Sequence, residues 1–145
     1  MFILDTDSIT HDQNAHPVLI ERVKNTPRQH LFTTSVTIEE QLKGRLAYLN
    51  RHRKSPRQSA QGHAALVQTI FYFSQWNILL YREDVDAEFR RLQKQRLLIG
   101  SQDLRIAAIA LVHSFTVVTS NRRDFIQVPN LKVEDWTKPA QENVS

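Results

Sequence analysis

Short apolar runs alternate with longer amphipathic stretches along this chain. Residues 2–4, 31–34, 78–81 and 115–118 read as strands, and 131–133 reads as a further edge strand. Residues 2–4 are wholly apolar, which is typical of a strand buried on both faces of a parallel sheet. The alternation predicts an α/β fold with a mostly parallel sheet of four to five strands flanked by helices. In such a fold, ligands bind at the carboxyl ends of the strands.

The stretches between these strands show the apolar period of helices. A helix is expected over 18–23, and others begin after Ser35, after Ser55 and at Asp84. The segment 102–113 is apolar nearly all round, so we expect a buried helix there. The positions expected to face the core in the amphipathic helices are Ile20, Val23, Ile38, Leu42, Leu46, Leu49, Leu66, Ile70, Phe73, Val85, Phe89 and Leu92.

Length and composition indicate one soluble domain, which we place at residues 1–136, with 137–145 as a flexible C-terminal tail. The chain has 145 residues, of which 41% are hydrophobic and 23% are charged. Cysteine is absent, which excludes disulfides and thiolate metal sites. No two of the six histidines lie four residues apart, so a histidine-based zinc site is not expected. Any metal must therefore be held by oxygen.

The longest apolar run, residues 106–112, is too short to cross a bilayer, and no signal sequence is evident at the N-terminus. We therefore expect a cytoplasmic protein with no membrane association. The net charge is +4 and the pI is about 9.7, which favours a polyanionic partner such as nucleic acid. A merely basic surface explains this balance equally well.

Four acids, Asp5, Glu40, Asp103 and Asp124, stand where a strand ends or a helix begins. Each has a simpler explanation when taken alone, such as a helix cap or a solvated helix position. The predicted topology brings all four to one edge of the sheet. A group of carboxylates there predicts a site for Mg²⁺ or Mn²⁺, which bind hard oxygen ligands.

Five segments together resemble the PIN-domain family, and within it the VapC-type ribonuclease toxins of toxin–antitoxin pairs. They are residues 2–7 (FILDTD), 40–44 (EQLKG), 99–108 (IGSQDLRIAA), 118–125 (VTSNRRDF) and 128–131 (VPNL). The resemblance runs from Phe2 to Trp136. It implies a PIN-like three-layer sandwich and a metal-dependent endoribonuclease that hydrolyses RNA phosphodiester bonds. It also implies an RNA substrate, a small cognate antitoxin and a homodimer.

The resemblance also implies roles for individual residues. Asp5, Glu40 and Asp103 match the acids that bind Mg²⁺ or Mn²⁺, and with Asp124 they form the expected catalytic set. The fourth site residue is either Asn121 or Asp124, and the charge of Asp7 is an extra whose role stays open. The candidate contacts to a metal-linked water or to the phosphate are Thr119, Ser120 and Asn121.

Either Glu39 or Glu40 could be the acid that binds the metal. The helical wheel places Glu39 nearer the core than Glu40, whereas the family spacing to Gly44 selects Glu40 as the ligand.

A basic run is the candidate contact to the RNA backbone. Its residues are Arg51, Arg53, Lys54 and Arg57. A second basic group, at 90–96, has the spacing of an ordinary solvated helix face.

Two other functions compete with the nuclease hypothesis. The pair Asp5 and Asp7 after a strand resembles the two-aspartate motif of haloacid-dehalogenase-type phosphatases, in which the first acid is a nucleophile. Those enzymes also need a well-placed lysine, and none lies close to the late acidic segments. The other alternative is a PIN-like module that binds nucleic acid or protein without cutting.

Overall fold

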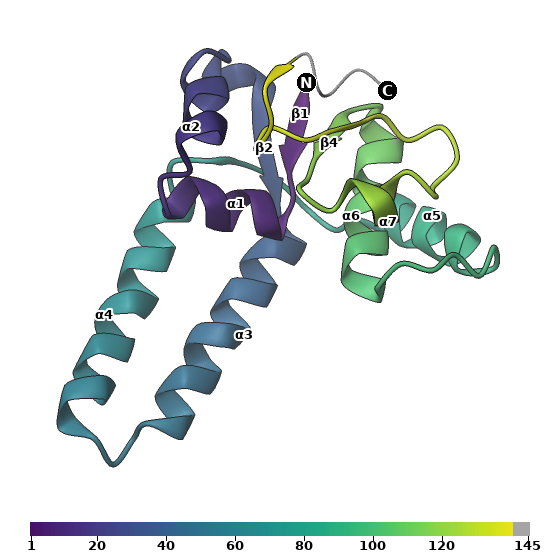
Figure 1. The fold of residues 1–145 in the computed structure, drawn as a ribbon. Helices are drawn as coiled ribbons and strands as arrows, with labels where there is room; N and C mark the ends of the chain where they lie inside the picture. The colour runs from purple at the N-terminus through teal and green to yellow at the C-terminus, as the bar shows by residue number, and fades with distance from the viewer. Residues whose placement is uncertain (141–145) are drawn as a thin grey trace.

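The computed structural model describes residues 1–140, and the strands in this range form one sheet (Figure 1). They are β1 (Phe2–Leu4), β2 (Leu31–Thr34), β3 (Asn77–Leu79), β4 (Thr116–Val118) and β5 (Val133–Glu134). The strand order is β3-β2-β1-β4-β5, and every neighbouring pair is parallel. The predicted α/β fold with a helix-flanked parallel sheet is confirmed. All strand carboxyl ends meet at one edge.

Helices cover both faces of this sheet. They are α1 (Thr6–Gln13), α2 (Pro17–Lys24), α3 (Ser35–Arg51), α4 (Pro56–Phe73), α5 (Glu83–Gln93), α6 (Ser101–His113) and α7 (Arg122–Phe125), with a 3₁₀ turn at Arg28–His30. Figure 1 shows α1 and α2 on one side of the strands and α5, α6 and α7 on the other. The long helices α3 and α4 form an antiparallel hairpin that extends well beyond the sheet.

The two faces of the sheet have separate cores because successive strand side chains point to opposite faces. Ile3 and Val117 belong to the core that contains α5 and α6, whereas Leu4 and Val118 belong to the core beneath α1 and α2. All four side chains are fully buried. The predicted inward positions of α5, Val85, Phe89 and Leu92, are confirmed as buried, and six of the 13 residues of α6 are buried as well.

Local capping explains where several helices begin. The Thr34 hydroxyl accepts the backbone N–H of Thr37 and caps α3, so the cap lies one residue before the predicted Ser35. Ser55 caps α4, and Pro56 occupies the first helical turn as predicted. Helix α1 was not predicted, because its sequence TDSITHDQ has no apolar stripe. It begins at the cap formed by Asp5, whose side chain accepts the N–H of Ser8.

Two positions predicted to face the core are exposed instead. Leu46 of α3 and Ile70 of α4 each keep 55% of their surface accessible. Both lie on the hairpin, where α3 and α4 pack against each other but the sheet does not reach. The third strand is also displaced from the predicted 78–81 to Asn77–Leu79.

At the C-terminal end of the described range, Trp136 is buried against Phe2, and the Thr137 N–H donates to Asp135 Oδ1 at 2.9 Å. Most of the predicted tail, residues 141–145, lies outside the described residues. Within residues 1–140, no helix is both long and apolar enough to span a membrane.

Candidate functional site

Asp5 and Thr119 lie next to each other at the carboxyl edge of the sheet. Asp5 follows β1, Thr119 follows β4, and these two strands are paired neighbours. The Asp5 N–H donates to the Val118 carbonyl at 3.1 Å, which extends the ladder by one residue. The Ser8 hydroxyl donates to the same carbonyl at 2.9 Å. The start of α1 is thereby fixed against the end of β4, and Asp5 is held between them.

The Asp5 carboxyl is almost completely buried, with 2% of the residue exposed. Burial raises its pKa from 3.8 to about 7, because the charged form loses its hydration. Hydrogen bonds from the Thr119 side chain and the Ser8 backbone lower this pKa, and the nearby charge of Asp7 raises it. Asp5 therefore both caps α1 and is a carboxyl that takes up a proton near neutral pH.

Asp103 lies in the first turn of α6 and is coupled to three other carboxylates. Its pKa is raised from 3.8 to about 6, first by burial and then by the charges of Glu40, Asp7 and Asp124. These residues come from α3, α1 and α7. The structure therefore brings together acids that are about 100 residues apart in sequence, as the topology predicted, and Asp7 joins them as an additional charge.

Glu40 and Glu39 point to different surroundings. Glu40 Oε1 accepts the Thr6 hydroxyl at 2.8 Å, on the side of α3 that faces α1 and Asp103. Glu39 is exposed and accepts the Gln102 side-chain amide at 2.8 Å. The helical wheel was therefore wrong to place Glu39 nearer the core. Of the two, Glu40 is the residue that lies among the other acids.

The segment after β4 brings both candidates for the fourth site residue to the same place. Asn121 Nδ2 donates to Asp124 Oδ2 at 2.7 Å, so the two form one hydrogen-bonded pair. Thr119 is fully buried, and its hydroxyl accepts the Asn121 N–H at 2.9 Å while also bonding to Asp5. Ser120 is exposed. Thr119 thus joins Asp5 to the Asn121–Asp124 pair, and Ser120 remains open to solvent.

The donor chemistry of this group suits a hard divalent cation. All of its charged groups are carboxylates, and their mutual repulsion, seen in the raised pKa of Asp103, is relieved by a cation. Within residues 1–140, however, no three acidic or histidine side chains surround one point as ready ligands. Glu40 and Asp124 are instead turned toward Thr6 and Asn121. Mg²⁺ commonly takes only one or two carboxylates and keeps several waters, so the set fits such an ion.

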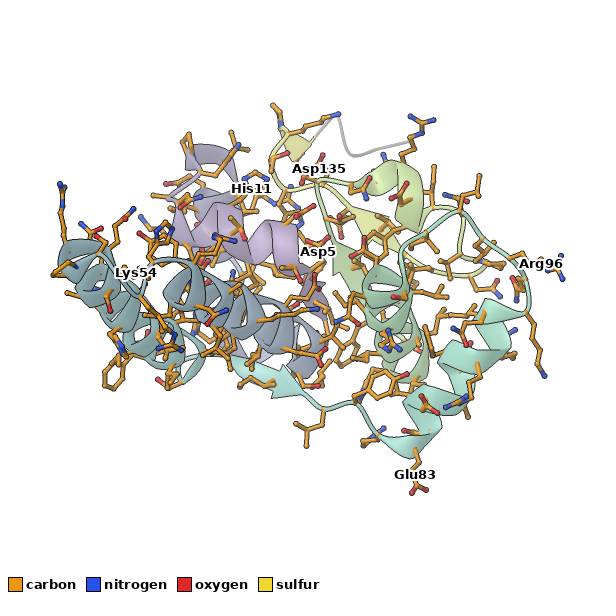
Figure 2. All side chains as sticks on the ribbon, turned by 90° about the horizontal axis from the view of Figure 1, so that it is seen from below. Asp5, His11, Lys54, Glu83, Arg96 and Asp135 are labelled. Carbon is orange, nitrogen blue, oxygen red and sulfur yellow. The ribbon has the colours of Figure 1, made fainter. Side chains whose placement is uncertain are left out.

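The predicted basic run lies at the far tip of the α3–α4 hairpin, and Figure 2 shows Lys54 well away from Asp5. Arg51, Arg53, Lys54 and Arg57 are all exposed. None of them forms an ion pair within residues 1–140. In the second basic group, Arg90 pairs with Asp86 and Arg91 with Glu88. The hairpin tip therefore carries unpaired positive charge, whereas two of the charges on α5 are neutralised within the helix.

Sequence reasoning missed the hydroxyl groups that hold the acids. Thr6 bonds to both Glu40 and Thr37, and Ser8 anchors α1 to β4. The available signal was Asp5 itself, because aspartate is a preferred residue type at the N-cap of a helix. An assignment of that cap would have placed a helix where the apolar pattern showed none.

Comparison with known proteins shows similarity along nearly the whole chain. No protein-family model matches it. It is 28% identical to a protein named ribonuclease VapC1 of Haemophilus influenzae, over 95% of this chain and 99% of the relative. It is 25% identical to a tRNA(fMet)-specific endonuclease VapC of Salmonella typhimurium, over 93% and 97%. The structure of VapBC-1 from nontypeable Haemophilus influenzae superposes with a TM-score of 0.73 at 26% identity, covering 94% and 98%.

Proposed function

We propose that this chain, which resembles the VapC-type ribonucleases in sequence and PIN-like fold, is a metal-dependent endoribonuclease acting as the toxin of a toxin–antitoxin pair. The observation that carries the proposal is the coupling of Asp103 to Glu40, Asp7 and Asp124 at the sheet edge where Asp5 emerges. Such a concentration of partly buried carboxylates has an electrostatic cost, which a bound cation offsets. The names of the relatives support RNA as the substrate.

We assign Asp5, Glu40 and Asp103 as the residues that hold Mg²⁺ or Mn²⁺. When bound, the cation supplies activation of a water molecule and neutralises charge that develops on the phosphate. Asp124 is the fourth catalytic acid, and its hydrogen bond with Asn121 makes the two a single unit. Thr119 positions Asp5, because its buried hydroxyl connects that carboxylate to the backbone of Asn121. Ser120, exposed beside this unit, is the candidate contact to the substrate phosphate.

The partners follow from the same site. We propose a cognate antitoxin that presents an Arg or Lys to the carboxylates, because a guanidinium satisfies two carboxylates at once. The similarity to VapBC-1 of Haemophilus influenzae supports such a complex. A homodimer is expected by the resemblance, and exposed apolar side chains are available to bury in either interface. They include Leu46, Val67, Ile70, Phe71 and Leu80.

The test is cleavage of RNA by the purified chain. We expect cleavage with Mg²⁺ or Mn²⁺, none with excess chelator, and loss of at least about 100-fold in Asp103→Asn, a change that removes one ligand charge and keeps the side-chain shape. Asp84→Asn, an exposed acid at the start of α5, is the matched control and should cleave normally. Cleavage that survives chelation or Asp103→Asn would refute the assignment. RNA binding without any cleavage would instead favour the non-cleaving module.

A further inference from the structure

A large pocket lies between α1, α3 and α4, next to the carboxylates. Its volume is about 850 Å³. Helices α1 and α3 touch at Thr6 and Glu40, beside Asp103, and touch again at Thr10 and Gln41, which line the pocket. Thr10 lies one helical turn beyond Thr6, which is about 5.4 Å along α1. The pocket therefore begins about one turn away from the proposed catalytic acids.

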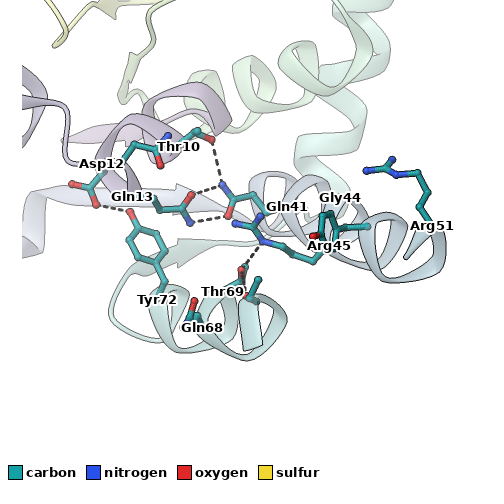
Figure 3. A pocket seen from close by; sticks show the side chains of 13 residues that line it. Thr10, Asp12, Gln13, Gln41, Gly44, Arg45, Arg51, Gln68, Thr69 and Tyr72 are labelled. Atoms are coloured by element: carbon teal, nitrogen blue, oxygen red, sulfur yellow. Dashed lines mark hydrogen bonds between the residues drawn. The ribbon is translucent and has the colours of Figure 1, made fainter. Parts of the chain in front are cut away.

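Arg45 contributes an uncompensated positive charge to this pocket (Figure 3). Its Nε donates to Thr69 Oγ1 at 3.0 Å, and Thr69 in turn donates to the Ala65 carbonyl at 2.7 Å, so the guanidinium is held in place. It has no other hydrogen bond and no ion pair within residues 1–140. Asp12, the acid among the lining residues, accepts the Tyr72 hydroxyl at 2.5 Å and forms no ion pair with Arg45. The remaining guanidinium N–H groups are thus free to bind an anion.

Besides Arg45, the pocket presents polar side chains together with the rings of Tyr48 and Tyr72, and it extends toward the hairpin tip. Gln13 and Gln41 exchange side-chain amide hydrogen bonds at 2.8 and 2.9 Å. Arg51 lines the outer end of the pocket and begins the basic run at the tip. Along the axis of α3, Arg45 is displaced from Glu40 by about 7.5 Å and Arg51 by about 16.5 Å, at about 1.5 Å per residue. At about 3.4 Å per stacked nucleotide, this distance corresponds to about five nucleotides.

We propose that this pocket binds the RNA strand beside the bond that is cut, with Arg45 as its principal phosphate contact and Arg51 as the outer one. This inference rests on the proposed nuclease function and adds the path of the substrate. A bidentate guanidinium suits a phosphodiester, and neutral amides suit bases and riboses. A partner peptide would seek apolar anchors, and the exposed apolar side chains of α4 lie outside the lining. They are Val67, Ile70 and Phe71.

Binding is measured separately from cleavage in the Asp103→Asn background. The probe is a fluorescein-labelled single-stranded RNA of about 12 nucleotides, titrated by anisotropy at several salt concentrations. Arg45→Gln should weaken binding about tenfold and reduce the salt slope by about 0.7, the value for one phosphate contact on a single strand. Arg51→Gln should weaken it by a factor of about two to three. Arg96→Gln, an exposed arginine beyond α5 with no ion pair within residues 1–140, is the matched control and should bind unchanged.

Arg45→Lys keeps the positive charge at this position. It therefore shows whether the weaker binding of Arg45→Gln comes from the lost charge or from a loss of folding. It should recover most of the salt slope with part of the affinity, because lysine keeps the charge without the bidentate geometry. Equal RNA binding by Arg45→Gln and Arg96→Gln would overturn the inference and leave the nuclease assignment intact. The inference is overturned in the same way if Arg45→Gln leaves RNA binding unchanged and weakens only the complex with the cognate antitoxin. Binding that depends on Arg45 in a chain that never cleaves RNA would refute the nuclease and keep the pocket assignment.

Discussion

Replacement of Asp5 by Asn should stabilise the metal-free protein at alkaline pH. The Asp5 carboxyl has a pKa of about 7 in the folded chain against an ordinary value of 3.8, so folding favours its protonated form. Its contribution to stability is fully present below about pH 4 and is lost as the pH rises through about 7. Asparagine is always neutral, and its side-chain oxygen can still accept the Ser8 N–H at the cap of α1.

The size of the effect follows from the two pKa values. Between pH 5 and pH 8, the single-site linkage relation gives a loss of about 2.6 kcal/mol from Asp5 in the wild-type chain. Asp103 has a raised pKa as well, but it is present in both proteins and cancels in the comparison. The hydrogen bonds of the neutral asparagine do not change with pH in this range, so they shift the stability of the variant equally at both pH values. We therefore expect the advantage of Asp5→Asn to grow by about 2.6 kcal/mol between pH 5 and pH 8.

The assay is urea unfolding in chelator at both pH values, with the free energy of unfolding extrapolated to water. Asp84→Asn is the control, because a hydrogen bond from Arg82 lowers the pKa of Asp84, and its neutralisation should bring no gain at pH 8. A difference between Asp5→Asn and the wild type that stays constant from pH 5 to pH 8 would show that Asp5 titrates normally. Burial of Asp5 would then carry no electrostatic cost for a bound cation to offset.

Three further predictions concern side chains around the site and the hairpin. Glu40→Gln should reduce RNA cleavage by at least about tenfold and Glu39→Gln by less than about twofold, and the opposite order in a cleavage assay would show that the ligand was misassigned. Thr119→Val removes a hydrogen bond that lowers the pKa of Asp5, so Mn²⁺ affinity measured by calorimetry should fall more at pH 7 than at pH 8.5; an equal fall at both would contradict this. Gly44→Ala should raise the free energy of unfolding by up to about 1 kcal/mol, since nothing lies within 4 Å of the added Cβ. Gly62→Ala would place its Cβ 2.7 Å from Leu49, so urea unfolding should show it at least about 1 kcal/mol less stable than Gly44→Ala; equal stability would refute the close packing of α3 on α4.

The parts of the fold that were predicted correctly are those with an unambiguous pattern of apolar residues. The wholly apolar segment 2–4 and the nearly all-apolar segment 102–113 were expected to be buried, and Ile3, Leu4 and six residues of 102–113 are. Helix α1 was missed because its stability comes from the Asp5 cap and from the contact of Ser8 with β4, and neither produces an apolar stripe. The predictions for Leu46 and Ile70 were wrong because an apolar stripe does not reveal how far a hairpin extends beyond its sheet.

The candidate site was predicted in outline because parallel strands bring their carboxyl ends to one edge. The helical wheel was wrong to place Glu39 nearer the core than Glu40, because their surroundings depend on where α1 and α6 lie relative to α3, which the sequence of α3 does not contain. The pocket with Arg45 was not predicted for a similar reason. Arg45 is one arginine in a helix of mixed charge, and its importance appears only when Thr69 of α4 fixes it and Tyr72 engages Asp12.

The most direct test of the carboxylate site is the number of protons released when Mn²⁺ binds. With pKa values of about 7 for Asp5 and about 6 for Asp103, the two carboxyls together carry about one proton at pH 6.5 and almost none at pH 8.5. Binding through both carboxylates must expel that proton. Titration calorimetry in buffers of different ionisation enthalpy should therefore show release of about one proton per Mn²⁺ at pH 6.5 and almost none at pH 8.5. A binding heat that does not depend on the buffer at pH 6.5, or no binding at either pH, would contradict the account.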